Sequence, residues 1–524
     1  MIRIRQIKIN VNIDSPSLLE KKISQKLKIS NRDIIKYEIS KRSIDARDKK
    51  NILYVYEVDV EIKNEGKVLD RINSSDIFSY VEEKYVFPTT INMMNSRPII
   101  VGSGPAGLFS AYMLASSGFN PIILERGERV EDRINTVEKF FKDNVLDPNS
   151  NVQFGEGGAG TFSDGKLNTL TKDNLRCKKV FEIFVECGAP KEILYTHNPH
   201  IGTDILREVI INMRNKIISM GGEFRYRSCV TDLKTHKGKI TGVIVNNNEE
   251  INSNYVVLAI GHSARDTFKM LRNKHVSMKP KNFAIGVRVE HPRSMIDNWQ
   301  YGDFSKNLGA ASYKLTYQTK EGRGVYSFCM CPGGFVVNAS SEEGRLVVNG
   351  MSNHARSEKN SNSAIVVSVS PKDFGDDLFA GMAYQRLLEE KAYKLCNGVI
   401  PVQLYKDFCD NTVSSEFGKI TPNTKGSYDF GNIRSILPKF VSDSIIEAMP
   451  EFGKKIKGFD RSDTIFLGVE TRTSSPVVIE RDDSFESSIK GLYPCGEGAG
   501  YAGGITTAAI DGVKVAEEIV LSLK

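Results

Sequence analysis

The chain has 524 residues, of which 40% are hydrophobic and 26% are charged. This length allows two or three domains that each bury a core, and the composition is that of an ordinary globular protein. Eight cysteines in a chain of this length exclude a disulfide scaffold. Because no two of them are spaced as CxxC, a zinc ribbon is excluded as well.

The beginning of the chain carries no targeting signal that we recognise. Its sequence MIRIRQIKINVN alternates apolar and polar residues as a strand does, unlike a secretory signal. No stretch approaches the roughly eighteen uninterrupted apolar residues of a transmembrane helix. We therefore expect a cytoplasmic protein with no membrane partner.

Positive charge is concentrated at the N-terminus. Residues 1–50 contain 14 Lys and Arg against 6 Asp and Glu, whereas the rest of the chain is close to neutral. A basic module of this kind could bind RNA or another acidic partner. The alternative, which we favour, is a solvated helix face together with strand edges protected by lysine.

Residues 1–95 are predicted to form a small α/β domain. An opening strand is followed by a helix at SPSLLEKKISQKLKI, which Ser15 or Ser17 could cap, and by strands at DIIKYEISKRS and NILYVYEVDVEI. The β-α-β-β order is typical of a ferredoxin-like or similar two-layer sandwich. The segment MMNSRP at 93–98 is predicted to link this domain to the next.

A nucleotide-binding motif follows this linker. Gly102, Gly104 and Gly107 form G-x-G-x-x-G between an apolar strand and a helix, which is the context that the motif requires. The first glycine permits the tight turn, the second lets backbone N–H groups approach a pyrophosphate, and the third allows close helix–strand packing. The N-terminus of the helix offers N–H donors and a positive dipole end to the phosphates.

The spacing continues with Ala111, Gly118 and Glu125. Glu125 is predicted at the end of the second strand, where a carboxylate can accept both ribose hydroxyls. A phosphorylated ribose would be repelled there, which argues against NADP. The motif alone leaves NAD and FAD as alternatives.

Two later segments favour FAD. YVVLAIGH (255–262) resembles the second fingerprint of two-dinucleotide flavoproteins, and GLYPCGEGAGYAGGITTAAIDG (491–512) resembles the C-terminal flavin-contacting segment of the glutathione-reductase-like clan. The resemblance implies that Gly496 and Glu497 lie near the ribityl–phosphate region, although many clan members have aspartate in place of Glu497. It also implies that amide groups of Gly503, Gly504 and Ile505 face the flavin N1/O2 edge, where they would stabilise reduced flavin.

The resemblance extends over most of the chain. It is carried by the runs FGEGGAGTFSDGKL (154–167), LAIGHSARDT (258–267), FAIGVRVEHP (283–292), SFCMCPGG (327–334) and VETRTSSPV (469–477). Together they resemble the bacterial family loosely described as FAD-dependent, or NAD(FAD)-utilising, dehydrogenases, whose substrate is not established. This implies an α/β fold with a Rossmann-type FAD-binding domain at 96–281 and 464–524, and an inserted mixed α+β substrate or cap domain at 282–463.

The run GEGGAG at 155–160 also fits G-x-G-x-x-G, but TFSDGKLNT follows it where a helix should begin. We reject it as a second dinucleotide fold and expect a loop that lines FAD; the alternative is a structural turn cluster. NAD(P)H would then dock in the substrate cleft, or electrons would come directly from an organic substrate or a partner protein.

The residues expected to contact FAD are Gly102, Ser103, Gly104, Pro105, Ala106, Gly107, Glu125, Arg126, Gly157, Gly158, Gly160, Thr161, Lys166, Val230, Gly261, Gly496, Glu497, Gly503, Gly504 and Ile505.

Cys329 and Cys331 are the first candidates for the chemistry. They are two residues apart in a strand-like run, so we expect their side chains on one face of the strand. One thiol could lie over the flavin as a nucleophile or redox relay, and a strained disulfide is a further alternative. The plain alternative, which we favour, is that both are small residues packed in the substrate domain.

The other catalytic candidates are charged or titratable side chains. Arg288 shares a strand face with Glu290, which indicates an ion pair or a substrate-carboxylate anchor. Arg472 is a candidate carboxylate clamp. His200 and His262 flank glycine turns and are candidates for acid–base roles. No His/Cys cluster has metal-ligand spacing, so we expect no metal.

These observations favour an FAD-dependent oxidoreductase that transfers a hydride between flavin N5 and a small organic substrate, with NAD(P)H as a co-reductant. Two alternatives stay open: a flavoprotein that acts on RNA through the basic N-terminal domain, and a non-catalytic redox sensor.

Overall fold

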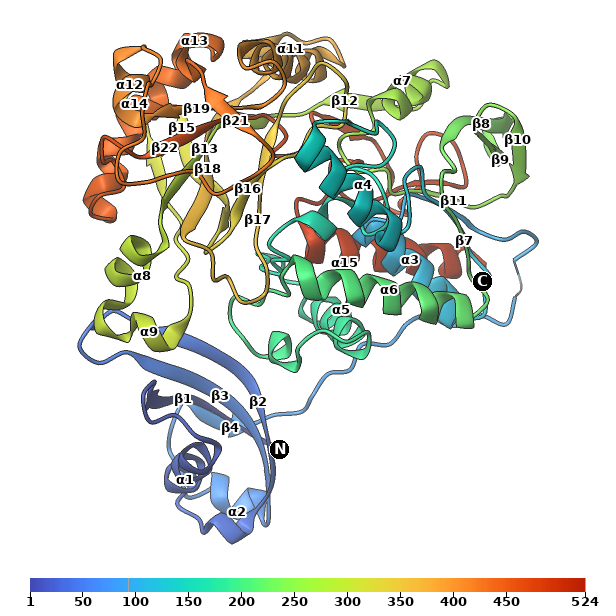
Figure 1. Cartoon of the computed structure of the whole chain (residues 1–524). Helices are drawn as coiled ribbons and strands as arrows, with labels where there is room; N and C mark the ends of the chain where they lie inside the picture. Colours follow the sequence, from blue (N-terminus) through green and yellow to red (C-terminus); the bar gives the residue numbers. More distant parts are fainter. Residues whose placement is uncertain (93, 524) are drawn as a thin grey trace.

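The computed structural model describes residues 1–92 and 94–523. Its N-terminal part is a four-stranded antiparallel sheet in the order β2-β3-β1-β4, and Figure 1 shows both of its helices on the same side of the sheet. The elements are β1 (Ile2–Asn10), α1 (Pro16–Leu27), β2 (Ile34–Asp45), β3 (Leu53–Ile62), α2 (Glu65–Leu69) and β4 (Ile77–Ser79). Helix α1 begins where predicted, because the Ser15 hydroxyl accepts a hydrogen bond from Leu18 N and Pro16 occupies the first turn.

From Tyr80 to Pro98 the described residues form no helix or strand. This segment runs along the C-terminal helix, where the Tyr85 hydroxyl donates to the Glu517 carboxylate and the Asn92 amide donates to Leu523 O. The linker predicted at 93–98 includes Met93, which lies outside the described residues.

A five-stranded parallel sheet follows, in the order β24-β11-β5-β6-β7. Its strands are β5 (Ile99–Val101), β6 (Ile122–Leu124), β7 (Glu223–Arg225), β11 (Val256–Leu258) and β24 (Leu492–Pro494). Each strand has three residues and is buried on both faces, except for the edge strand β7, so the segments read as short apolar runs without alternation. Strands that are distant in the sequence, such as β5 and β24, therefore share one sheet.

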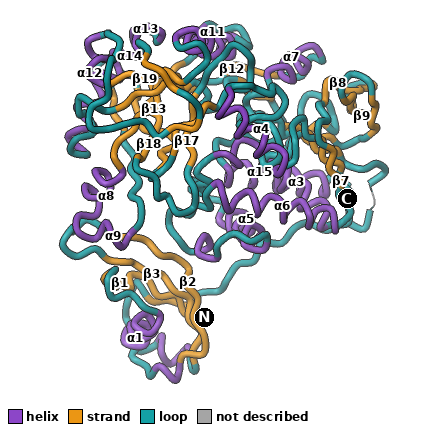
Figure 2. The backbone as a smooth tube through the Cα atoms, in the orientation of Figure 1, coloured by secondary structure: helices purple, strands orange, loops and turns teal. Residues whose placement is uncertain are grey.

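Helices cover one face of this sheet and a small antiparallel sheet covers the other (Figure 2). Ile100 and Ile123 pack against α3 (Pro105–Ser116), α6 (Thr203–Ser219) and α15 (Ile505–Leu521), with α5 (Asn174–Glu186) behind them. Val101 and Leu124 pack against the sheet β8-β9-β10 and against α7 (Arg265–Asn273). The small sheet consists of β8 (Val230–His236), β9 (Lys239–Val245) and β10 (Glu249–Asn252).

A second large sheet has seven strands in the order β14-β15-β18-β13-β22-β19-β21. They are β14 (Thr316–Gln318), β15 (Gly324–Cys331), β18 (Asn360–Val369), β13 (Phe283–Pro292), β22 (Ile465–Glu470), β19 (Ile400–Leu404) and β21 (Tyr428–Phe430). We expected the inserted domain to end at residue 463, but β22 pairs with both β13 and β19 inside this sheet. The sheet therefore extends to residue 470.

The remaining elements surround the two large sheets. They are α4 (Val130–Asp143), β12 (Met278–Pro280), α8 (Arg293–Tyr301), α9 (Ser305–Leu308), β16 (Phe335–Asn338), β17 (Val348–Met351), α10 (Pro371–Phe374), α11 (Ala380–Leu395), α12 (Tyr405–Asp410), β20 (Thr424–Lys425), α13 (Ile433–Ile436), α14 (Lys439–Lys455) and β23 (Val477–Ile479). Short strands β12 and β23 pair with each other where the chain leaves and re-enters the Rossmann-type part. Among the described residues, no helix has the length and apolarity needed to cross a membrane.

Candidate functional site

A cavity of about 350 Å³ lies where the parallel sheet meets the seven-stranded sheet. The carboxyl ends of β5, β6 and β11 open into it, as does the chain after β24. This is the edge at which open α/β sheets bind their ligands. The opposite wall comes from β15 and from the residues that end β22.

The three positions of the first motif are occupied by glycine for different structural reasons. Gly102 has φ +97°, and a Cβ there would lie 2.4 Å from Ala259 O; a Cβ on Gly107 would lie 2.0 Å from Gly102 O. Both are thus required by the packing of the protein itself. A Cβ on Gly104 would meet nothing closer than 3.9 Å, because this residue faces the cavity at the start of α3. Only Gly104 keeps space for a ligand.

Glu125 is buried at the end of β6 and is held by four protein donors. Its Oε2 accepts from Ser103 N at 2.9 Å and Ser103 Oγ at 2.7 Å, and its Oε1 accepts from Gly127 N at 2.9 Å and Gly155 N at 3.1 Å. A carboxylate has about four acceptor positions. The expected ribose hydroxyls would therefore have to share Glu125 with the protein, and the Ser103 hydroxyl is the donor that can rotate away.

Beside Glu125 the cavity has a flat, cationic wall. The Arg126 guanidinium lies 4.5 Å from the ring centre of Phe154, donates to Cys229 Sγ at 3.0 Å and pairs with Asp266. Val230 completes this wall. A planar guanidinium stacked on an aromatic ring suits contact with an adenine base.

The glycine-rich loop divides into a lining part and a supporting part. Gly158, Gly160 and Lys166 line the cavity. Gly157 and Thr161 do not line it: the Thr161 hydroxyl donates to Glu156 O at 3.1 Å, and a Cβ on Gly157 would collide with that hydroxyl. The loop is therefore both a ligand wall and a turn cluster.

The C-terminal segment places the N-terminus of α15 at the cavity. Gly503, Gly504 and Ile505 line it, and a Cβ on either glycine would meet no protein atom within 4 Å. The first N–H groups of a helix have no partner within the helix and carry its positive dipole end. This end of the cavity is thus suited to a group that becomes negatively charged.

Glu497 lines the cavity, whereas Gly496 lies behind it against Ala106. Burial raises the pKa of Glu497 to about 7, and the positive charge of Lys281 opposes this only in part. Gly261 also lines the cavity, and Gly107 does not.

Two predicted catalytic residues, Arg288 and Arg472, are engaged in buried ion pairs. Arg288 is fully buried and does not pair with Glu290: it donates to both oxygens of Glu470 at 2.9 and 3.1 Å. Arg472 reaches the cavity, but Nε and Nη2 donate to Glu389 at 2.9 and 2.7 Å. Because both guanidinium groups are engaged in bidentate pairs, neither offers a free fork to a substrate carboxylate.

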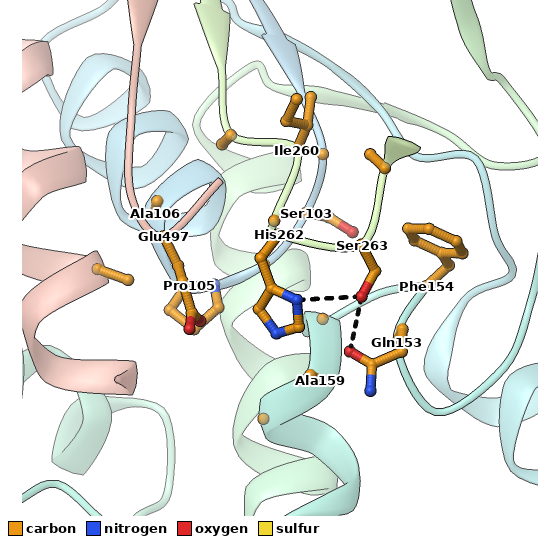
Figure 3. Close-up of a pocket in the computed structure, with 18 of the residues that line it drawn as sticks. Ser103, Pro105, Ala106, Gln153, Phe154, Ala159, Ile260, His262, Ser263 and Glu497 are labelled. Carbon is orange, nitrogen blue, oxygen red and sulfur yellow. Dashed lines mark hydrogen bonds between the residues drawn. The ribbon is translucent and has the colours of Figure 1, made fainter. Parts of the chain in front are cut away.

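His200 lies outside the cavity wall and stacks on His354 with ring centres 5.1 Å apart. Burial lowers its pKa to about 4. The histidine that does line the cavity is His262, whose Nδ1 lies 3.2 Å from the Ser263 hydroxyl. Figure 3 shows that hydroxyl between the His262 ring and the Gln153 amide. Burial lowers the pKa of His262 to about 3, so its ring is neutral at physiological pH.

The cysteine pair is not on a regular strand. A bulge between Phe328 and Cys331 breaks the alternation, so Cys329 lines the cavity and Cys331 is buried behind it. The expectation that both side chains share one face of a regular strand is therefore wrong. Several cavity residues were not predicted at all, namely Gln153, Phe154, Asn168, Cys229, Phe328, Asn349, Glu470 and Thr473. No local pattern marks them, because they come together only when the two sheets pack.

These features fit one ligand class. The cavity combines a glycine turn at a helix N-terminus, a stacking wall beside a buried carboxylate, and a second helix N-terminus at its far end. Together they define a flavin-dinucleotide-binding protein. Among the described residues, no group of three or more His, Cys, Asp or Glu side chains could hold a metal ion.

Comparison with known proteins agrees with this class. Residues 282–473 match a family model described as "FAD-dependent protein, C-terminal domain-like", and residues 1–61 match a domain of unknown function. FAD is the cofactor of this protein, as predicted. An uncharacterised protein of Clostridium beijerinckii is 49% identical over 527 residues, which cover 99% of this chain and 98% of that protein. The chain belongs to the same family as this protein.

More distant matches are short or weak. An L-amino-acid oxidase of Demansia vestigiata is 52% identical over 40 residues, which are 8% of each chain. Among solved structures, a flavin-dependent brominase is 14% identical, with 82% of this chain and 79% of that chain covered and a TM-score of 0.38. A glycine oxidase of Bacillus cereus is 12% identical, with 82% and 98% covered and a TM-score of 0.35.

Proposed function

We propose that the protein is an oxidoreductase in which bound FAD exchanges a hydride with a small organic substrate between the two large sheets. The observation that carries this proposal is the far end of the cavity. The N-terminus of α15 forms one side there, and Phe328 and Cys329 of β15 together with Thr473, which follows β22, form the other. Clefts between a dinucleotide fold and a second domain are usual ligand sites.

A second cavity of about 500 Å³ supports a route for the substrate. It shares Phe328, Thr473 and Gly503 with the first cavity and extends past Asn282 and Tyr326. A substrate that enters this way would reach the α15 end of the FAD cavity without passing the adenosine end. The flavin supplies the hydride chemistry when it is bound.

The chain's own residues would serve that chemistry by electrostatics. The N–H groups at Gly504 and Ile505 would stabilise negative charge on the reduced cofactor. His262 is neutral and can donate or accept one hydrogen bond. Lys166 is the cation of the glycine-rich loop that lines the cavity, and it would attract an anionic substrate.

NAD(P)H is proposed as a co-reductant that docks in the second cavity. Among the described residues, the G-x-G-x-x-G turn joined to a parallel sheet occurs once, at β5, so a pyridine nucleotide has no dinucleotide fold of its own.

Anaerobic stopped-flow mixing of the holoprotein with NADH, NADPH and a metabolite library tests the function. We expect rapid bleaching of the flavin absorbance with at least one reductant. If no reductant bleaches the flavin faster than free FAD, a non-catalytic sensor becomes the better description.

The contacts within the N-terminal module favour a structural role for it over a role in RNA binding. Its β-α-β-β-α-β order and its antiparallel sheet support a ferredoxin-like module over residues 1–95. Arg3 pairs with Asp59 at 2.6 Å, Arg5 with Glu57 at 3.0 Å, and Arg47 with an aspartate two residues away. These pairs lower the density of free positive charge that RNA binding requires.

A further inference from the structure

Cys329 lies in a strained part of β15. Phe328 pairs with Ala364 and Cys331 pairs with Asn362, so β15 has one extra residue opposite β18. Cys329 occupies this bulge with φ +43°. A non-glycine residue rarely adopts that region, and such strain persists only where the surroundings impose it. Bulges of this kind often reorient a side chain next to an active site.

At the bulge the Cys331 thiol turns back towards the Cys329 backbone. Cα atoms two residues apart on a regular strand are separated by about 6.7 Å, close to the upper limit for a disulfide. Here the Cys331 thiol turns back to donate to Cys329 O at 3.4 Å. Arg288 donates to the same carbonyl at 3.1 Å and holds it in place.

The charges around the pair distinguish its two members. The neighbouring Cys331 thiol, the amino group of Lys166 and the guanidinium of Arg288 lower the pKa of the Cys329 thiol, against the opposing effects of burial and of Asp164. The neighbouring Cys329 thiol and burial raise the pKa of Cys331. These effects favour the thiolate at Cys329, which faces the FAD cavity, over the thiolate at Cys331 behind it, and the thiolate is the reactive form of cysteine.

We propose that Cys329 and Cys331 are a redox pair that exchanges two electrons with bound FAD. In the forward direction an S–S bond forms between the two sulfur atoms and the S–H bond of Cys331 breaks. The two electrons and the proton pass to oxidised flavin, which becomes the anionic reduced form. The reverse direction reduces the disulfide. One negative charge and one proton stand on each side, so the exchange balances.

This arrangement differs from the plain packing of two small side chains. Packing alone does not require a cysteine in the left-handed region at the wall of a cavity. The proposal rests on the proposed function only through the location of the flavin at this end of the cavity. Electron counting and substrate turnover therefore test the two ideas separately.

The test is an anaerobic reductive titration of the air-oxidised holoprotein with dithionite, followed by the flavin absorbance. A disulfide is a two-electron couple, so we expect the natural protein to take up four electrons per FAD. The Cys329→Ser and Cys331→Ala variants should take up two. Cys409→Ser is the matched control, because Cys409 lies on α12 outside the cavity wall, and it should still take up four.

Mass spectrometry of the same samples gives a second measurement. We expect a peptide in which Cys329 and Cys331 are linked, present before reduction and alkylated at both sulfurs afterwards. If the buried Cys331→Ala variant fails to fold, Cys329→Ser, whose hydroxyl would face the cavity, decides the matter. Uptake of only two electrons by the natural protein, with both thiols free in the oxidised sample, would overturn the proposal. That result together with normal bleaching by a substrate would leave the proposed function intact.

Discussion

At the scale of single residues, the interior of this protein contains many charged groups, and most of them are paired. Arg288 with Glu470 and Arg472 with Glu389 are buried bidentate pairs. Glu290 is different, because it is fully buried and its oxygens accept from the Asn423 backbone N–H at 3.2 and 3.1 Å rather than from a guanidinium. A buried carboxyl without a cationic partner becomes neutral instead of paying the desolvation cost of its charge.

Glu290 makes stability depend on pH in a defined direction. Burial raises its pKa to about 7, whereas an unfolded chain has a glutamate pKa of about 4.3. Between these values the unfolded state binds fewer protons, so the free energy of unfolding falls as pH rises and the loss is complete above pH 7. Gln carries no charge at any pH. We therefore expect Glu290→Gln to be more stable than the natural protein at pH 8, by on the order of 1–3 kcal/mol, and to lose this advantage at pH 4.5.

Urea unfolding of the holoprotein at pH 4.5, 6 and 8 measures this difference. The exposed Glu343→Gln is the matched control and should show no pH-dependent gain. A constant difference across the three pH values would contradict the prediction.

Glu125 gives a second prediction at this scale. Its removal leaves the N–H groups of Ser103, Gly127 and Gly155 without their acceptor, each at a cost of about 1–3 kcal/mol if it stays buried. We expect Glu125→Ala to raise the FAD dissociation constant at least tenfold. Equilibrium dialysis of FAD measures this, with the exposed Asp132→Ala as the control. Unchanged affinity would place the ribose away from Glu125.

At the scale of elements, the glycines in the turn between β5 and α3 meet two separate requirements, which are close packing within the protein and space for a ligand. Gly102 and Gly107 allow strand, turn and helix to approach one another, whereas Gly104 leaves room for a ligand. Gly104 has φ −71° and ψ −178°, which a β-branched residue adopts readily. The motif should therefore respond differently to substitution at its second and third glycines.

We expect Gly104→Val to fold and to be colourless, because its Cβ would meet no protein atom closer than 3.9 Å and its side chain would fill the space kept for the pyrophosphate. Gly107→Ala should fail to fold or should unfold many degrees lower, because its Cβ would lie 2.0 Å from the Gly102 carbonyl oxygen. Circular dichroism and flavin absorbance of both purified variants check this. A yellow Gly104→Val protein would place the pyrophosphate elsewhere.

At the scale of the whole molecule, one buried ion network joins the two large sheets. Glu389 on α11 accepts from Arg472, which follows β22, and from Arg265 on α7 of the Rossmann-type part. Burial alone would raise the pKa of Glu389, but the two guanidinium groups hold it below its ordinary value. The carboxylate thus stays charged between two cations and connects the walls of the FAD cavity.

Removal of this carboxylate leaves the buried Arg472 with only Glu342 at 3.9 Å as an acidic partner, whereas Arg265 keeps its pair with Glu342 at 2.6 Å. We expect Glu389→Ala to lower the free energy of unfolding by about 3–5 kcal/mol and to weaken FAD binding, because Arg472 lines the cavity. Glu390→Ala is the control on the next residue of the same helix, since Glu390 makes only an exposed pair with Lys394. Calorimetry of both variants is the measurement, and equal melting temperatures would show that the network contributes nothing to the connection.

The sequence by itself determined the parts of this protein that depend on neighbouring residues. The β5–α3 turn, Glu125 at the end of β6 and the N-terminus of α15 follow from local spacing, because a tight turn at a helix start requires glycine at particular positions. The resemblance of distant segments was enough to name FAD, which the family comparison confirmed.

Only the tertiary structure decided which side chains meet at the far end of the cavity. Arg288 and Arg472 are not free to bind a substrate carboxylate, because each pairs with an acidic residue on another element, Glu470 and Glu389 respectively. The bulge at Cys329 depends on the register of β15 against β18, which one strand cannot specify alone. Local spacing therefore predicts where the dinucleotide binds, whereas the residues that face its reactive end come from strands and loops that are distant in the sequence and become neighbours only through packing.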